Sequence, residues 1–153
     1  MKSSILLANR FREVLLDGLW IANTNYKHQL SDLTWQQATT KIGSLNTIVA
    51  ITFHINYYIG GVLPVFDGGS LDIKDKYSFD APEITSQEDW KSLVNSLIVN
   101  AEIFANKVEQ LEDKQLINAF VDQKYGSYQR NIEGMIEHCY YHLGQISLIK
   151  KMV

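Results

Sequence analysis

Apolar residues recur at steps of three and four along several stretches of the chain, which is the spacing of one face of an α-helix. The clearest stretch follows residue 86. Its apolar positions form a seven-residue repeat sustained over three heptads: Trp90, Leu93, Leu97, Ala101, Phe104, Val108 and Leu111. Such a repeat is typical of helices that pack in a bundle. A coiled coil between chains is the weaker interpretation, because the repeat ends near residues 112–113.

The periodic stretches predict four long helices, over residues 4–30, about 45–59, 86–111 and about 128–152. No stretch shows the strict alternation of a half-buried strand. We therefore predict an all-α fold, a four-helix bundle with a long connection between its second and third helices. The length of 153 residues fits one domain spanning residues 1–153.

Start and stop signals set the expected ends of these helices. Ser44 and Ser127 are the expected N-caps of the second and fourth helices, and the pair Gly60-Gly61 is expected to end the second. The pattern Thr85-x-x-Glu88 predicts a capping box at the start of the third helix. A second such pattern, Thr34-x-x-Gln37, predicts one short extra turn.

The connection over residues 61–86 has no helical period and is rich in acidic residues. From Asp67 to Asp89 there are seven acidic residues and two lysines, which gives this segment a charge of −5. It is long enough to cross from one end of a bundle to the other, which changes the order of helix directions. We expect it to lie over one end of the bundle near the histidines described below. The alternatives are a solvated tether and a contact with a second subunit.

Composition excludes several classes of protein. Hydrophobic residues make up 46% and charged residues 20%, values that exclude disorder as the main state. The net charge of −3 disfavours nucleic-acid binding. The single cysteine, Cys139, forms no internal disulfide and fits a reducing cytosol. The apolar run Ile5–Ala8 is too short for a secretory signal, so we expect a cytoplasmic protein.

One apolar window, residues 47–66, has the length of a membrane span. It contains His54 and Asn56 as well as two glycines and a proline. Polar and ionisable groups at bilayer depth are costly. We interpret the window as a buried helix with its exit loop, and we expect no membrane partner.

Histidines supply the chemistry that stands out. His138 and His142 stand at i and i+4, where the Cβ atoms of helical residues lie about 5–6 Å apart. His54 lies mid-way along the most apolar expected helix. Two imidazoles on one helix and one on a facing helix make a three-histidine site with open coordination positions, which is the layout of catalytic metal sites. Gln145, one turn after His142, is a candidate hydrogen-bond partner of a ligand.

Simpler interpretations exist for each of these residues. A helical histidine pair at this spacing arises often by chance, and buried imidazoles only need hydrogen bonds. His28, near the expected end of the first helix, suits the helix dipole and not a metal. Cys139 points about 100° away from His138 and is expected to be a small buried side chain. The tyrosines beside the histidines, Tyr57, Tyr58, Tyr140 and Tyr141, are expected to pack and not to act as acids or bases.

Other enzyme motifs are missing from the sequence. There is no G-x-S-x-G string, no P-loop and no dinucleotide-binding glycine pattern. No Glu-x-x-His motif occurs in two helices, which disfavours a ferritin-like di-iron centre. No catalytic residue is assigned from the sequence.

His54 in the second expected helix, with His138-x-x-x-His142-x-Gly144-Gln145-Ile146 in the fourth, resembles the DinB/YfiT-like metalloenzyme superfamily. The expected helix lengths and the long connection are similar along nearly the whole chain. The resemblance implies a four-helix bundle with a divalent metal held by His54, His138 and His142, often as a homodimer. Better-understood relatives include thiol-dependent transferases and isomerases, in which the metal activates a low-molecular-weight thiol. The cysteine and paired tyrosines between the ligands depart from that pattern and are expected to reshape the site.

Two functions follow as expectations. One is a metal-dependent enzyme, a transferase or hydrolase that acts on a small molecule, with a low-molecular-weight thiol as a candidate partner. The other is a non-catalytic bundle that binds a metal, a small ligand or a partner subunit. Three imidazoles suit zinc, nickel, iron or copper. We expect zinc or nickel to be observed, with iron as a further candidate.

Overall fold

The computed structural model describes residues 2–153, and every regular element in that range is helical. The helices are α1 (Ser3–Arg12), α2 (Tyr26–Leu30), α3 (Trp35–Thr39), α4 (Ile48–Phe66), α5 (Gln87–Gln110), α6 (Asp113–Leu116) and α7 (Tyr128–Lys150). A π-helical turn, η1 (Glu13–Asp17), follows α1, and two 3₁₀ turns, η2 (Asp75–Tyr77) and η3 (Gln123–Tyr125), lie in connections. The all-α prediction is confirmed.

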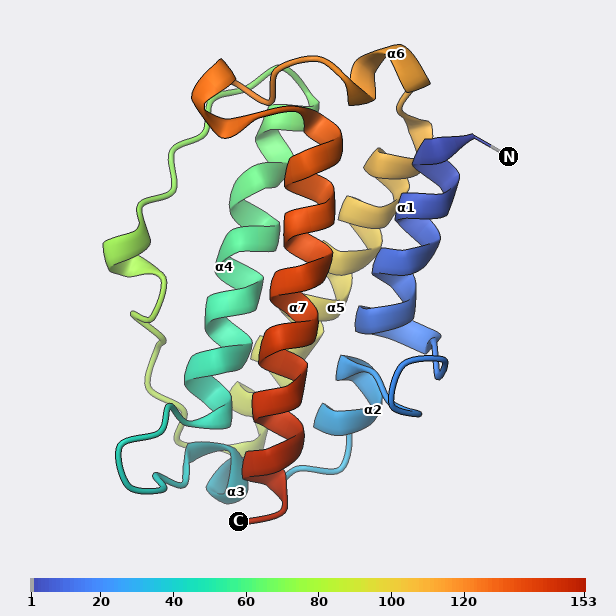
Figure 1. Ribbon diagram of the computed structural model, residues 1–153. Helices are drawn as coiled ribbons and strands as arrows, with labels where there is room; N and C mark the ends of the chain where they lie inside the picture. Colours follow the sequence, from blue (N-terminus) through green and yellow to red (C-terminus); the bar gives the residue numbers. More distant parts are fainter. Residues whose placement is uncertain (1) are drawn as a thin grey trace.

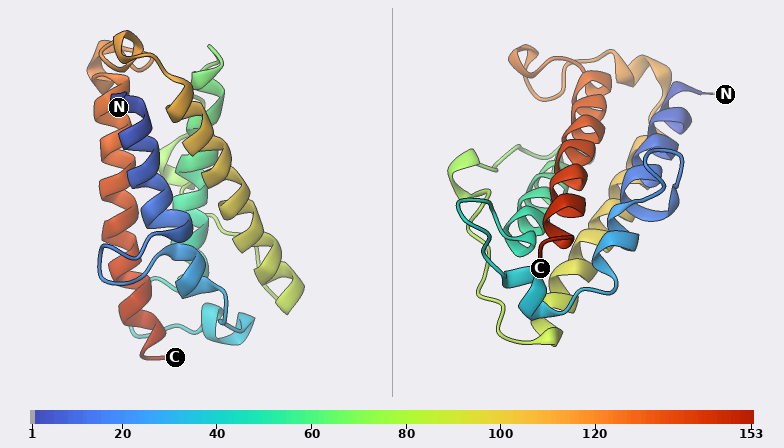
Figure 2. Two further views of the ribbon diagram at one scale, coloured as in Figure 1. Left: turned by 90° about the vertical axis from the view of Figure 1, so that its right-hand side faces the viewer. Right: turned by 60° about the horizontal axis from the view of Figure 1, so that its bottom comes forward.

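Four helices, α1, α4, α5 and α7, lie side by side (Figures 1 and 2). α4 packs against α5 and α7, and α1 packs against the same two helices. α4 and α5 run in the same direction, because residues 67–86 carry the chain back from one end to the other (Figure 1). The predicted crossing is therefore confirmed. The connection runs along the side of α4 and not over one end of the helices, so that part of the expectation is wrong.

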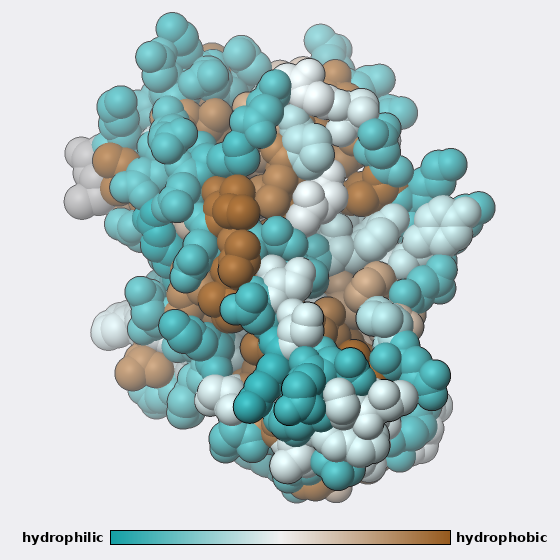
Figure 3. Space-filling view, turned by 180° about the vertical axis from the view of Figure 1, so that it is seen from behind, coloured by the Kyte–Doolittle hydropathy of each residue, from teal (hydrophilic) through white to brown (hydrophobic). Residues whose placement is uncertain are grey.

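The heptad repeat predicted the buried face of α5 correctly. Every position of the repeat is at most 8% exposed, and Leu97, Ala101 and Val108 are completely buried. Phe104 packs on Phe11 of α1, with ring centroids 4.4 Å apart. Each fully buried side chain of this size contributes about 1.5–3 kcal/mol. Seen from behind, the surface of the molecule is largely hydrophilic, with an apolar band near the centre of the view and smaller apolar areas beside it (Figure 3).

The first helix is shorter than predicted. Instead of one helix over residues 4–30, α1 continues into η1 and the chain leaves helical geometry at Gly18. A Cβ atom at Gly18 would lie 2.1 Å from Cγ of Glu13, so only glycine fits there. The Asn25 side chain then donates to the Gly18 carbonyl at 2.9 Å and accepts from the His28 amide, which caps α2. The apolar residues between, such as Leu19 at 56% and Ile21 at 44% exposure, continue the helical period but face solvent.

The second predicted helix is longer than expected, because Gly60-Gly61 do not end it. α4 continues through Pro64 to Phe66. A Cβ atom at Gly61 would lie 2.1 Å from a methyl carbon of Ile73, and one at Gly60 would lie 3.0 Å from the Asn100 amide. These glycines therefore permit close packing of the connection and of α5 on α4. The chain turns out of the helix at Gly68, whose φ of +80° favours glycine.

The predicted caps are partly confirmed. Thr34 forms the capping box with Gln37, and Ser127 caps α7 by accepting from the Arg130 amide. α4 is capped by Thr47 and not by Ser44. α5 is capped by Ser86, which accepts from the Asp89 amide, so its cap lies one residue after the predicted Thr85.

α4 is long and apolar enough to cross a membrane by length and composition, and it is the one such helix among residues 2–153. Half of its apolar window is buried inside the protein. Its apolar side chains, including Ile51, Ile55 and Ile59, are core residues here. The apolar character of α4 is thus accounted for by packing against α5 and α7.

Candidate metal centre

Three histidines from two helices meet in one cluster. His54 comes from the middle of α4, and His138 and His142 come from successive turns of α7. The Nε2 atom of His138 lies 3.1 Å from Nε2 of His54 and 3.0 Å from Nε2 of His142. Within residues 2–153 it is the one group of three or more side chains placed so that they could hold a metal ion. The three histidines therefore lie close enough to bind one metal ion, as the sequence predicted.

Hydrogen bonds fix the protonation of the outer two imidazoles. Nδ1 of His54 lies 3.2 Å from the carbonyl oxygen of Ser78, and Nδ1 of His142 lies 2.6 Å from Oε1 of Gln145. Both oxygens are acceptors, so each Nδ1 carries the proton. The Nε2 atoms of His54 and His142 then present lone pairs to the centre of the cluster.

This arrangement fits a metal ion better than hydrogen bonding alone. His138 has one Nε2 and two lone pairs facing it, and a neutral imidazole donates only one proton. One close pair of Nε2 atoms is therefore left without a proton between them. A Zn–N bond of about 2.0–2.1 Å puts neighbouring nitrogens of a tetrahedral site about 3.3 Å apart. Two of the three separations, 3.0 and 3.1 Å, are close to that value, and all three ligand atoms lie within 4.8 Å of one another.

The environment keeps all three imidazoles neutral. Burial lowers the pKa of His54 and of His142 below the ordinary histidine value. Burial lowers the pKa of His138 to about 4, and the neighbouring His142 and His54 add to the effect. Metal ligation requires neutral imidazole. At neutral pH the three side chains are thus in the form that binds a cation.

The connection covers His54. The ring of Phe79 stacks on the imidazole, with centroids 4.0 Å apart and planes inclined by 12°. Two tyrosines of α4 hold this part of the connection in place. Tyr57 donates to the Lys74 carbonyl at 3.0 Å and accepts from its amide at 2.9 Å. Tyr58 donates to a carboxylate oxygen of Asp75 at 2.8 Å. The connection therefore lies beside the histidines, as expected.

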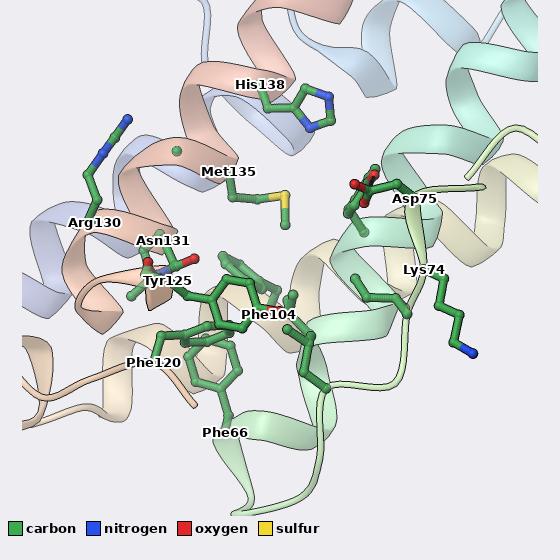
Figure 4. Close-up of a pocket in the computed structure, with 16 residues that line it drawn as sticks. Phe66, Lys74, Asp75, Phe104, Phe120, Tyr125, Arg130, Asn131, Met135 and His138 are labelled. Carbon is green, nitrogen blue, oxygen red and sulfur yellow. Dashed lines mark hydrogen bonds between the residues drawn. The ribbon is translucent and has the colours of Figure 1, made fainter. Parts of the chain in front are cut away.

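A cavity of about 650 Å³ opens next to His138, between α4, α7 and residues 71–75. Its far wall is aromatic, with Phe66, Phe104 and Phe120 (Figure 4). The Met135 side chain extends from α7 toward the middle of the space (Figure 4). Among the residues that line it, Asp75 carries the one carboxylate. Metal chemistry at the histidines would thus take place beside a space large enough for a small molecule.

The structure also places the other three candidate residues, His28, Cys139 and Gln145. His28 lies in α2 outside the cluster, with its Nδ1 3.2 Å from the Thr24 hydroxyl. Cys139 is completely buried, and burial raises the pKa of its thiol. Gln145 contacts His142, whose Nδ1 lies 2.6 Å from the accepting Oε1 atom. Its expected role beside a metal ligand stays a prediction.

Sequence reasoning missed three residues around the cluster: Asp75, Ser78 and Phe79. Tyr58 was expected beside the histidines as a packing residue, and it lies four residues after His54 on the same helical face. The three missed residues all lie in the connection. No local pattern indicates which of its residues returns to His54.

No protein-family model, no curated protein and no solved structure matches the chain. The assignment of a metal centre therefore rests on the geometry of the three histidines and of the groups around them.

Proposed function

We propose that the protein is a metal-dependent enzyme, a transferase or hydrolase acting on a small molecule, with one divalent ion held by His54, His138 and His142. The observation that supports it is the convergence of three Nε2 atoms, two of which are 3.0 and 3.1 Å from the third. We also propose that the side-by-side helices form a four-helix bundle of the DinB/YfiT-like kind. The sequence string around His138 and His142 supports that assignment.

Each neighbouring residue has a part in this proposal. The Ser78 carbonyl and Gln145 orient His54 and His142, as partners of metal-bound histidines commonly do. Three protein ligands leave at least one coordination position open, as in catalytic sites. An ion at this centre supplies a Lewis acid and lowers the pKa of a bound water or thiol. Zinc is the proposed ion, with nickel and iron as alternatives that imidazole ligands also suit.

The cavity favours catalysis over simple metal storage. A storage site needs no space for a second molecule, whereas here His138 forms part of the wall of a large cavity. Asp75 brings a carboxylate to the same wall, where it can accept or hold a proton of a bound molecule.

Metal content tests the proposal first. Protein purified without a nickel column should hold one ion per chain by elemental analysis. Replacing His54, His138 or His142 by Ala should each remove most of it, because two imidazoles hold an ion far less well than three. His28→Ala is the matched control and should keep the wild-type content. A His54→Ala protein that still binds one ion at native affinity would rule out this ligand set.

A turnover screen then separates enzyme from binding protein. The metal-loaded protein is incubated with simple esters and with thiols plus electrophilic acceptors, and His138→Ala protein serves as the blank. Turnover that requires both metal and His138 supports the enzyme. Stable metal binding without turnover on any substrate class favours the non-catalytic bundle. The expected homodimer and cytoplasmic location remain predictions.

A further inference from the structure

The cavity beside His138 has a definite chemical character. Phe66 is the centre of its aromatic wall, with ring centroids 5.5 Å from Phe104 and 6.3 Å from Phe120. Both neighbouring rings are buried, with exposures of 2% and 4%. Aromatic pairs at these separations attract one another and hold their geometry. The wall is therefore a preformed apolar surface that needs no rearrangement to accept a flat ring.

The flexible part of the cavity lies opposite this wall. Met135 extends into the space from α7 (Figure 4). Its unbranched thioether can change rotamer at low cost and makes favourable contacts with aromatic rings. An incoming ring can therefore displace or pack against Met135 without disturbing a helix.

The charged side chains of the rim do not face the interior. Arg130 and Lys74 both point away from the centre of the cavity (Figure 4). Arg130 donates to a carboxylate oxygen of Glu137 at 3.1 Å. At the histidine end of the cavity, Tyr58 donates to Asp75 and His138 joins the histidine cluster. Two further polar residues, Tyr125 and Asn131, line the cavity near Phe120, and the Asn131 amide donates to the carbonyl oxygens of Tyr125 and Ser127. The cavity thus combines the aromatic Phe66 wall with a polar group of residues at the histidine end.

We propose that this cavity binds the substrate as an apolar, ring-bearing small molecule, with the ring on the Phe66 wall and a single polar group directed to the histidine cluster. The proposal rests on the proposed metal centre for the polar end, and on the cavity alone for the ring. A volume of about 650 Å³ holds a bicyclic ring and its polar group. Long or highly charged molecules do not suit it.

Two hydroxamic acids test both ends together. Acetohydroxamic acid carries the metal-chelating group alone, and naphthalene-2-carbohydroxamic acid adds a ring. Their affinities for the zinc-loaded protein are measured by isothermal titration calorimetry. We expect the ring to tighten binding roughly tenfold or more, because it buries apolar surface. Equal affinities of the two acids for the wild-type protein would overturn the proposal.

Cavity variants test whether the added affinity of the ring-bearing acid comes from this cavity. Met135→Trp fills the middle of the cavity and should abolish the advantage of the ring, so that the two acids bind this variant with equal affinity. Met152→Trp makes the same change at a 50% exposed residue beyond α7 and should keep the full advantage. Val62→Phe narrows the cavity from α4 and provides the same test should Met135→Trp not fold. A ring advantage that persists in the folded cavity variants overturns the proposal.

A neutral dye separates this proposal from the metal centre. N-phenyl-1-naphthylamine fluoresces when it enters an apolar site and carries no chelating group. It should bind wild-type and Met152→Trp protein at one site, and Met135→Trp protein at least roughly tenfold more weakly. If the protein binds the dye but cannot bind zinc, the ring site is supported and the proposed metal centre is refuted. If the protein binds zinc but not the dye, the metal centre is supported and the ring site is refuted.

Discussion

Phe79 lies flat on the imidazole of His54, with 4.0 Å between the ring centroids. The preceding residue, Ser78, places its carbonyl oxygen 3.2 Å from Nδ1 of the same imidazole. Two successive residues of the connection therefore fix both the plane and the tautomer of this histidine. The connection forms one wall of the histidine cluster as well as linking α4 to α5.

Phe79→Ala should weaken metal binding without removing a ligand. Loss of the stacked ring lets the His54 imidazole rotate and lets water reach it. Changes to groups that orient a metal ligand typically cost about 10–100-fold in affinity, and we expect the lower part of that range because the Ser78 carbonyl remains. Competition with a chromophoric zinc chelator measures the effect. Tyr77→Ala is the control, since Tyr77 is 45% exposed and lies in the same connection. Equal weakening by both changes would refute a specific role for Phe79.

Gln145→Leu should lower metal affinity by about 10–100-fold, because it removes the acceptor that holds the proton on Nδ1 of His142. Gln145→Glu restores an acceptor and should bring affinity back to the wild-type level or above. The same chelator competition measures both variants. Leucine and glutamate variants with identical affinity would show that Gln145 acts only by filling space.

The metal-free protein should lose stability between about pH 6.5 and pH 4. Burial lowers the pKa of His54 and His142, and that of His138 to about 4, whereas an unfolded histidine titrates near 6.5. In this window the unfolded chain binds more protons than the folded chain, so the free energy of unfolding falls as the pH falls. Above about pH 6.5 the contribution is fully present. Urea titrations at several pH values measure it, and His138→Gln should flatten the dependence.

Metal should leave the protein in the acid range as well. Protons compete with the ion for the same Nε2 lone pairs. The lowered pKa values of the three histidines, about 4 for His138, and tight binding both shift release below about pH 6.5. Equilibrium dialysis followed by elemental analysis measures the bound fraction. Full retention well below about pH 4 would contradict ligation by three imidazoles.

Gly61→Ala should destabilise the protein by about 1–3 kcal/mol, the usual cost of overpacking. The new methyl group would meet Ile73 at 2.1 Å and push the connection away from α4. Gly134→Ala is the matched control on α7, where the added carbon meets only the end of the Arg130 side chain at 3.8 Å. That change should be neutral or stabilise by up to about 1 kcal/mol through helix propensity. Chemical denaturation measures both, and a neutral Gly61→Ala would contradict the packing role.

The amino-acid sequence by itself determined the features that depend on helical period. The heptad positions of α5 are buried because a helix returns to the same face every three to four residues, whatever packs on it. His138 and His142 approach each other for the same reason. Ser127 begins α7 because a cap depends only on its own neighbouring amides.

Only the tertiary structure decided where glycine ends a helix. The helical geometry ends at Gly18 but continues through Gly60 and Gly61. The local sequence is consistent with either outcome at both places. The difference is the space around the missing side chain, which Glu13 restricts in one case and Ile73 and Asn100 restrict in the other. Glu13 is near Gly18 in the sequence, whereas Ile73 and Asn100 come from the connection and from α5, so the contacts that require glycine at positions 60 and 61 depend on tertiary packing.

In the histidine cluster, too, some contacts follow from the sequence and others depend on the tertiary structure. The i, i+4 pair follows from the sequence, whereas the distance between His54 and His138 depends on how α4 packs on α7. Ser78, Phe79 and Asp75 reach the site because the connection runs back along α4, held by the hydroxyl groups of Tyr57 and Tyr58. A segment without hydrophobic periodicity gives no local sequence signal from which its course through the fold can be predicted. Its contacts are set by the surface on which it packs.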